Sequence, residues 1–283
     1  MTSAPRICLS TSSVFPGSTE TTFEIAAQLG FHAVEVMVTT DPDSQNASRL
    51  LALSRRYGVP VSAIHAPCLV LTQFVWGGDP VLKLRRSVEL ARQLGADVVV
   101  VHPPFRWQRD YAACFDELVA ELCSPGDVLV CVENMYPWHV PGRSVAAYSP
   151  GWDPRDHDWD HVTLDVSHCA AAAVDSVEMA DGLGCRLRHL HLTDGSGAPR
   201  DEHLVPGRGV QPVAKLVEQL GESGFRGQFV IEVNTRRTTS RAGQVADIAA
   251  SIAFVRTHLL ASGGYALAGT PAGELDLVRR SCH

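Results

Sequence analysis

Short apolar runs alternate with longer segments of helical period along nearly the whole of this chain. A strand, a helix and a second strand in this order form a right-handed parallel unit, so the alternation predicts a parallel sheet covered by helices. Eight such units follow one another without a break in composition. The expected strands span residues 6–9, 33–36, 59–64, 97–101, 127–132, 161–164, 187–190 and 228–231.

Eight consecutive units favour a closed (β/α)8 barrel, the TIM barrel. A doubly wound open sheet is the alternative, but such a sheet seldom contains eight consecutive right-handed units. The length of 283 residues suits one barrel of roughly 250 residues. We therefore expect a single α/β domain over residues 1–260. The remaining residues, 261–283, are rich in Gly, Ala and Ser near their start and predict a flexible C-terminal extension.

Capping residues mark the ends of several expected helices. Ser18 is suited to begin the first helix, and Gly30 to end it. Gly58 and Gly95 are placed to end the next two helices in the same way. Helical periodicity covers residues 18–30, 44–57, 79–94, 109–122, 210–220 and 241–260, and an Ala-rich helix follows the strand at 161–164.

The composition excludes several classes of protein. With 24 Lys and Arg against 31 Asp and Glu, the formal charge of −7 argues against nucleic acid as a partner. No basic leader or long apolar run indicates secretion or a membrane span. The 8 cysteines form no Cys-x-x-Cys pair. We interpret Cys8, Cys131 and Cys185, which lie in strand-like runs, as reduced core residues of a cytoplasmic protein, with a secreted disulfide framework as the alternative.

Residues that can bind metals recur where the expected strands end. In a barrel of this kind, the carboxyl ends of the strands form the rim on which active sites are built. Imidazole and carboxylate together are the ligands that zinc, manganese, cobalt or iron(II) require, and carboxylates packed closely without a cation would repel one another. The residues concerned are His65, His102, Glu133, Asp165, His168, His191, Asp201, His203 and Glu232.

Each of these residues has a plain structural interpretation when it is taken alone. A single histidine after a strand is more often a hydrogen-bonded rim residue, and a single carboxylate there can cap the next helix. Those roles would scatter such residues along the units, whereas here they recur at the same topological point. His189 lies two residues before His191, so it should face the same side of the barrel one layer lower. We interpret His189 as a core histidine bonded to a neighbour.

Taken together, these residues resemble the xylose isomerase-like TIM-barrel superfamily, which includes sugar isomerases and epimerases and also endonuclease IV. The resemblance runs from the first strand to the last helix. In the isomerase and epimerase branch it implies one divalent metal, Zn, Mn, Co or Fe, held by Glu133, Asp165, His191 and Glu232. It also implies that the two glutamates are the acid/base pair and that His168 contacts substrate.

Endonuclease IV uses a larger ligand set for up to three metal ions, and this resemblance extends to all nine residues. It adds His65, His102, His168, Asp201 and His203 as further ligands. Three departures count against a DNA-repair enzyme. The chain has Gly207-Arg-Gly209 where the endonuclease has Gly-Glu-Gly, the loop at 38–44 carries acidic residues, and the loop after His65 differs from the endonuclease signature.

Several residues near the rim are candidates for substrate binding. A guanidinium beside a metal site suits a carboxylate or phosphate, although Arg208 is equally suited to a surface salt bridge. His65 is placed to hold a substrate hydroxyl. Aromatic side chains in the rim loops can wall a pocket, pack within their loops or cover a subunit contact in a homo-oligomer. These aromatic residues are Phe74, Trp76, Trp107, Tyr136 and Trp138.

The leading functional hypothesis is a metal-dependent isomerase or epimerase of a small sugar, sugar phosphate, sugar acid or cyclitol. A metal-polarised carbonyl would acidify the neighbouring C–H, and Glu133 and Glu232 would exchange the proton. The second hypothesis is a hydrolase of phosphoesters with two or three metals. A catalytically silent barrel that binds a partner is the third and is poorly motivated by the residues. The expected partner is a small-molecule substrate.

Overall fold

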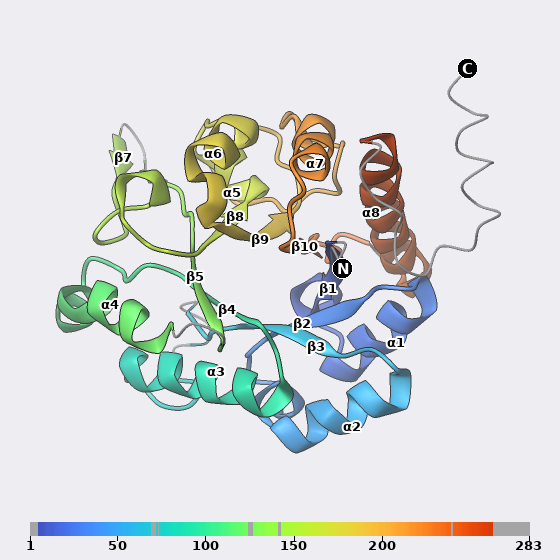
Figure 1. Cartoon of the computed structure of the whole chain (residues 1–283), viewed down its shortest axis with the longest axis horizontal. Coiled ribbons are helices and arrows are strands. Elements are labelled where there is room, and N and C mark those ends of the chain that lie inside the picture. Colours follow the sequence, from blue (N-terminus) through green and yellow to red (C-terminus); the bar gives the residue numbers. More distant parts are fainter. Residues whose placement is uncertain are drawn as a thin grey trace.

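The computed structural model describes residues 5–68, 72, 74–123, 127–140, 143–238 and 240–262. Eight parallel strands close into a barrel in the order β1-β10-β9-β8-β5-β4-β3-β2, which confirms the predicted TIM barrel. The helices lie outside the strands in Figure 1. The expected extension over 261–283 lies, from residue 263 onward, outside the described residues.

The barrel strands are β1 (Arg6–Ser10), β2 (Ala33–Met37), β3 (Val61–His65), β4 (Val98–Val101), β5 (Leu129–Glu133), β8 (Val162–Asp165), β9 (Leu187–Leu192) and β10 (Gln228–Ile231). The α-helices are α1 (Thr19–Leu29), α2 (Ala47–Tyr57), α3 (Pro80–Leu94), α4 (Arg109–Leu122), α5 (Val166–Ala171), α6 (Ser176–Leu183), α7 (Val213–Glu222) and α8 (Arg241–Ala261). Short 3-10 turns occur at η1 (Thr11–Val14), η2 (Pro42–Gln45), η4 (Pro154–Asp156) and η5 (Gly184–Arg186).

Two helices begin later than their periodicity predicts. The helix expected from residue 44 begins at Ala47, because Pro42–Gln45 form a 3-10 turn and Asn46 caps the helix through its side chain. The helix expected from residue 210 begins at Val213. There the N–H groups of Gly209 and Gln211 bind the Asp194 carboxylate, so these residues follow the preceding loop and not the helix.

The connections on either side of β8 are more elaborate than the sequence predicts. After β5, the segment rich in Pro, Trp and Tyr contains an antiparallel hairpin of β6 (Trp138–Val140) and β7 (Arg143–Val145). After β8, the single Ala-rich helix that was expected is two short helices, α5 and α6. Asp165 caps α5 and Asp175 caps α6 through their side chains, which explains why the helical segment is divided.

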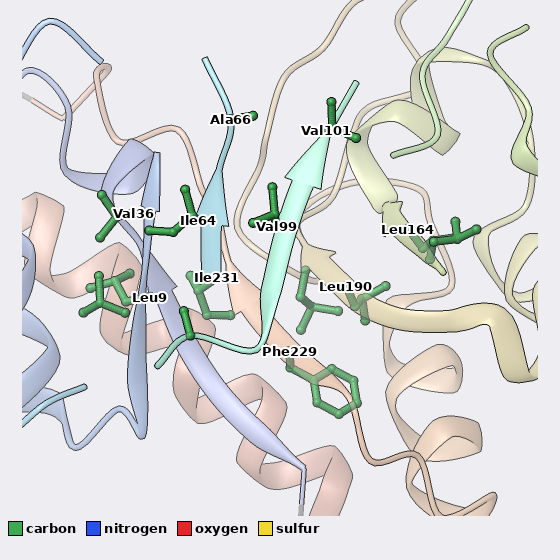
Figure 2. Packing of buried hydrophobic residues seen from close by; sticks show 14 of the residues in the cluster. Leu9, Val36, Ile64, Ala66, Val99, Val101, Leu164, Leu190, Phe229 and Ile231 are labelled. Atoms are coloured by element: carbon green, nitrogen blue, oxygen red, sulfur yellow. The ribbon is translucent and has the colours of Figure 1, made fainter. Parts of the chain in front are cut away.

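The largest apolar cluster lies between the strands and the surrounding helices. Figure 2 shows residues of this layer from several neighbouring strands, including Leu9, Ile64, Val99, Leu190 and Phe229. These side chains are buried together with apolar residues of all the longer helices. Burial of apolar area is the main favourable contribution to folding, so this outer layer is where most of the barrel's stability arises.

The interior of the barrel, by contrast, is largely polar. The Gln228 side chain of β10 reaches across to β3, where it accepts a hydrogen bond from Ser62 Oγ at 2.7 Å and donates one to the Ser62 carbonyl at 3.1 Å. One layer above, Glu35 of β2 lies 3.1 Å from His189 of β9. These strands are not neighbours in the barrel, so the contacts run through its interior. Apolar side chains inside the barrel form only small clusters.

The cysteines of the described residues are all unpaired. Cys8 and Cys131 are buried inside the barrel, as predicted. The interpretation of Cys185 as a core residue is wrong, because it lies in the 3-10 turn before β9 and is exposed. Across the described residues, no helix combines the length and the apolar character that crossing a lipid bilayer requires.

Replacing Gln228 by alanine should destabilise the fold, because it removes both hydrogen bonds to Ser62 in a buried setting. Leaving buried polar groups without partners costs about 2–3 kcal/mol in the free energy of unfolding. Chemical denaturation of the two proteins measures the difference. Gln93→Ala, on the exposed face of α3, is the matched control and should change stability little. Equal stabilities for Q228A and the wild type would show that the interior contact contributes nothing.

Candidate metal centre

Four of the predicted ligands meet at the carboxyl end of the barrel. Glu133 ends β5, Asp165 ends β8, His191 lies near the end of β9, and Glu232 follows β10. These strands are neighbours in the barrel, and one ligand atom from each residue lies within 4.8 Å of the others. All four side chains are buried. The strand ends therefore bring three carboxylates and one imidazole into one small volume.

The donor set fits a divalent cation. Asp165 Oδ2 is buried and has no hydrogen-bond partner within the described part of the chain, and its nearest imidazole nitrogen, His191 Nδ1, is 3.6 Å away. Buried carboxylate oxygens without donors are costly unless a cation or proton compensates them. Three carboxylates with one imidazole match the oxygen and nitrogen ligands of zinc, manganese or iron(II). Glu133, Asp165, His191 and Glu232 are thus the residues that could hold one ion.

In the protein without metal, a proton on His191 provides the compensating charge. His191 Nδ1 lies 3.0 Å from Glu133 Oε1 and 2.9 Å from Glu232 Oε2. Burial alone would lower the pKa of His191, but the charges of Glu232, Glu35 and Glu133 raise it well above its ordinary value. Burial alone would likewise raise the pKa of Glu133, but the charges of His191 and His102 lower it well below its ordinary value.

A second group shares Glu133 with the first. His65 ends β3 and His102 follows β4, and their ring centroids are 5.0 Å apart. His102 Nε2 lies 2.9 Å and His65 Nε2 3.4 Å from Glu133 Oε2. Burial lowers the pKa of His102 despite the nearby Glu133 charge. That favours the neutral imidazole, which is the form that binds metals.

A third group shares Asp165 with the first. It contains Asp165, His168 and His203, and Asp201 lies beside it. His203 Nε2 is 2.7 Å and His168 Nε2 is 3.6 Å from Asp201 Oδ2. Burial alone would lower the pKa of His168, but the charges of Asp165 and Asp201 raise it to about 10. The structure therefore brings eight of the nine predicted ligands into three groups that share Glu133 or Asp165, and Asp201 lies beside the third group.

The loop between β9 and α7 is fixed by two side chains. The Asp194 carboxylate accepts hydrogen bonds from the backbone N–H groups of Gly195, Gly207, Gly209 and Gln211. Ser167 Oγ donates to Asp201 Oδ1 at 2.7 Å and accepts from the N–H groups of Glu202 and His203. Gly209 is required because a Cβ there would lie 2.3 Å from the Gly195 carbonyl oxygen. These contacts position Asp201 and His203 at the rim of the barrel.

Glu35 is a site residue that the sequence analysis missed. It lies in the middle of β2, is fully buried, and its carboxylate is 3.2 Å from His191 Nε2 and 3.1 Å from His189 Nε2. The interpretation of His189 as a core histidine bonded to a neighbour is confirmed, because His189 is buried and its Nδ1 lies 3.4 Å from Thr163 Oγ1. The signal in the sequence was one charged residue inside the apolar run Ala33-Val-Glu-Val-Met37. His191 is thus held at Nε2 by Glu35, while Nδ1 faces the other carboxylates.

The residues predicted to bind substrate lie at different places on the molecule. Arg208 is 56% exposed and pairs with Asp247 of α8 at 2.7 Å, the geometry of the salt-bridge alternative. Trp107 is 59% exposed and stacks on Phe105 with 4.4 Å between ring centroids. Trp138 begins the β6–β7 hairpin, and its ring centroid lies 5.8 Å from that of Trp107. Their role in substrate binding stays a prediction.

Of the other aromatic rim residues, Phe74 lines one pocket with Trp107 and His102, whereas Tyr136 and Trp76 lie elsewhere. The Tyr136 ring is 5.1 Å from the His168 ring, which places it beside the third group. Phe74 is largely exposed, and Trp76 packs partly against the outer apolar core. The expected aromatic wall is therefore concentrated in the cluster of Phe105, Trp107 and Trp138, with Tyr136 nearest to the candidate ligands.

The family model for xylose isomerase-like TIM barrels matches residues 23–258. The chain belongs to this family. An uncharacterized protein of Mycobacterium tuberculosis is 48% identical over 279 residues, covering 92% of this chain and all of that protein. A fructoselysine 3-epimerase of Shigella flexneri is 21% identical over 76% of this chain and 85% of its own length.

Among solved structures, a D-tagatose 3-epimerase-like protein superposes with a TM-score of 0.68 at 24% identity. The alignment covers 91% of this chain and 98% of that protein. At this level of identity the likeness supports the barrel fold and its length. The chemistry of the site depends on the residues at the rim of this chain's own barrel.

Glu35→Gln should weaken metal binding while the barrel stays folded. The amide removes one acceptor for His191 Nε2 and the charge that orients the ring, and loss of such a partner typically costs 10- to 100-fold in metal affinity. Competition with a fluorescent chelator measures the dissociation constant for zinc or manganese. Glu89→Gln on the exposed face of α3 removes the same charge as a control. Equal metal affinities for E35Q and E89Q would show that Glu35 does not orient His191 for metal binding.

Metal binding should release a proton and weaken as the pH falls. His191 carries a proton between Glu133 and Glu232 in the metal-free protein, and a metal can bind Nδ1 only after that proton leaves. Because the pKa of His191 is raised, the competition extends through neutral pH. Calorimetry of zinc or manganese binding in buffers of different ionisation enthalpy counts the protons released. No release at pH 7 would show that His191 is neutral without metal.

Proposed function

We propose that this chain is a divalent-metal-dependent isomerase or epimerase of a small sugar, sugar phosphate, sugar acid or cyclitol. The observation that carries the proposal is the group of Glu133, Asp165, His191 and Glu232, in which two glutamates from different strands approach the same imidazole nitrogen. Two carboxylates at one small site suit removal of a proton and its return. The epimerase names of the fructoselysine and tagatose relatives give independent support.

A metal bound at this group would polarise a substrate carbonyl and acidify the neighbouring C–H. Glu133 or Glu232 then takes the proton at a carboxylate oxygen, and the other glutamate returns one. Ser12 Oγ donates to Glu232 Oε1 at 2.8 Å, which fixes one oxygen and leaves the other toward the site. His168 is held by its contact with the Asn134 carbonyl at 2.7 Å, and with His65 it would contact substrate hydroxyls.

Glu133→Gln and Glu232→Gln should each abolish solvent-proton exchange into substrate. An amide cannot act as a general base, and loss of general acid–base catalysis typically lowers the rate about 10²- to 10⁴-fold. The measurement is deuterium incorporation by NMR in D2O across a panel of ketoses, sugar phosphates, sugar acids and cyclitols. Glu178→Gln, exposed on α6, is the control and should exchange at the wild-type rate. Either active-site variant exchanging at the control rate would defeat the assignment.

The three overlapping groups favour a second candidate, a phosphoester hydrolase with two or three metals. Metal content per chain, measured by mass spectrometry after purification without chelator and after reconstitution, separates the candidates. One equivalent of metal per chain favours the isomerase or epimerase. Two or three equivalents, with cleavage of abasic DNA that His102→Ala removes, favour the hydrolase.

A further inference from the structure

A pocket of about 450 Å³ opens between the loops that follow β1 and β2. We call it the β1–β2 pocket, and its size lies within the range of small-molecule sites. Serine and threonine residues alternate with apolar groups in its lining, which also contains one acidic and one basic residue. The lining residues that matter here are Ser12, Phe15, Thr39, Thr40, Asp41 and Arg236.

The pocket adjoins the candidate metal centre through Ser12. Ser12 is part of the pocket lining, and its hydroxyl donates to Glu232 of the four-residue group at 2.8 Å. The chain after Glu232 is also tied to this region, because Thr235 Oγ1 donates to the Ser13 carbonyl at 2.6 Å. A ligand that spanned the metal centre and the pocket would pass Ser12, the residue that contacts both.

Arg236 lines the pocket with its hydrogen-bonding edge available. The guanidinium carbon lies 4.4 Å from the centre of the Phe15 ring, so the flat face of the group is stacked. Stacking on an aromatic face leaves the N–H donors at the edge free for a planar or tetrahedral oxyanion. Within the described residues no carboxylate pairs with this guanidinium, whereas Arg208, the arginine proposed for substrate binding, pairs with Asp247.

Asp41 shares the pocket with Arg236, but protein donors already occupy its carboxylate. Oδ2 accepts from the N–H and the hydroxyl of Thr19 at 2.8 and 2.7 Å, and Oδ1 accepts from the Asp43 N–H at 3.1 Å. The carboxylate thus sits at the start of α1, where helix N–H groups stabilise negative charge. Of the two charged groups in the lining, Arg236 is the one with unused hydrogen-bonding capacity.

We infer that the β1–β2 pocket binds the end of the substrate remote from the metal, and that this end carries an oxyanion, phosphate or carboxylate, held by Arg236. The inference rests on the proposed function and narrows its substrates to sugar phosphates and sugar acids. In this proposal Arg236, and not Arg208, is the arginine that binds the anion of the substrate. Uncharged sugars and cyclitols would lack the group that Arg236 binds.

Binding of small anions to the full chain after chelator treatment tests the assignment. Glycerol 3-phosphate and glycerate are titrated, with glycerol as the uncharged probe, and the rise in unfolding temperature gives each dissociation constant. We expect the anions to bind and Arg236→Gln to weaken them roughly 10- to 100-fold. Arg237→Gln removes the same charge from the adjacent exposed residue and should leave binding unchanged. Arg236→Lys should retain part of the affinity.

Tighter binding of the phosphate probe indicates phosphorylated substrates, and tighter binding of glycerate indicates sugar acids; both support the inference. No anion binding, or equal losses in R236Q and R237Q, overturns it. These measurements need neither metal nor turnover. If no sugar exchanges protons but anion binding depends on Arg236, the proposed function fails and the pocket assignment stands. If a sugar reacts and R236Q leaves both its KM and anion binding unchanged, only the inference fails.

Discussion

Repulsion among buried carboxylates is the constraint on which the site depends. Glu35, Glu133, Asp165 and Glu232 come from four strands and face the same narrow interior, where water cannot screen their charges. His191 supplies the opposite charge, and it comes from a different strand than each of the three glutamates it contacts. His191 is the centre of this arrangement, with Glu35 below it and Glu133 and Glu232 beside it. Neutralising the charge therefore also links strands across the barrel axis.

Stability and chemistry arise in different layers of this barrel. The outer layer, between strands and helices, contains nearly all the large apolar side chains and can supply the free energy of folding. Polar groups occupy the interior of the barrel. They extend from the Gln228–Ser62 contact to the ligand groups at the carboxyl ends of the strands. Burying ionisable groups is unfavourable, and a large outer apolar layer is what allows the fold to contain them.

The fold and most of the rim could be predicted because both follow simple rules. Alternating periodicity locates the strands, and topology puts every strand end on one rim, so seven candidate ligands follow from position, while Asp201 and His203 of the loop after β9 follow from the family resemblance. Glu35 could not be found this way. One acidic residue in a strand usually faces solvent, and its partner His191 is 156 residues away. The ion pair of Arg208 depends on how α8 packs, and the β6–β7 hairpin lies in a segment without periodicity.

The loop after β9 is held mainly by hydrogen bonds to its backbone, which limits the positions at which its sequence can change in evolution. Asp194 binds four backbone N–H groups, and Gly209 among them cannot carry a side chain, so the path of the loop depends on Asp194 and on glycine, while outer positions that donate nothing to Asp194 can vary. Arg208 occupies such an outer position. Descendants of this chain can thus accumulate new side chains around the rim, and so explore new ligands, while His203 keeps its place beside Asp201.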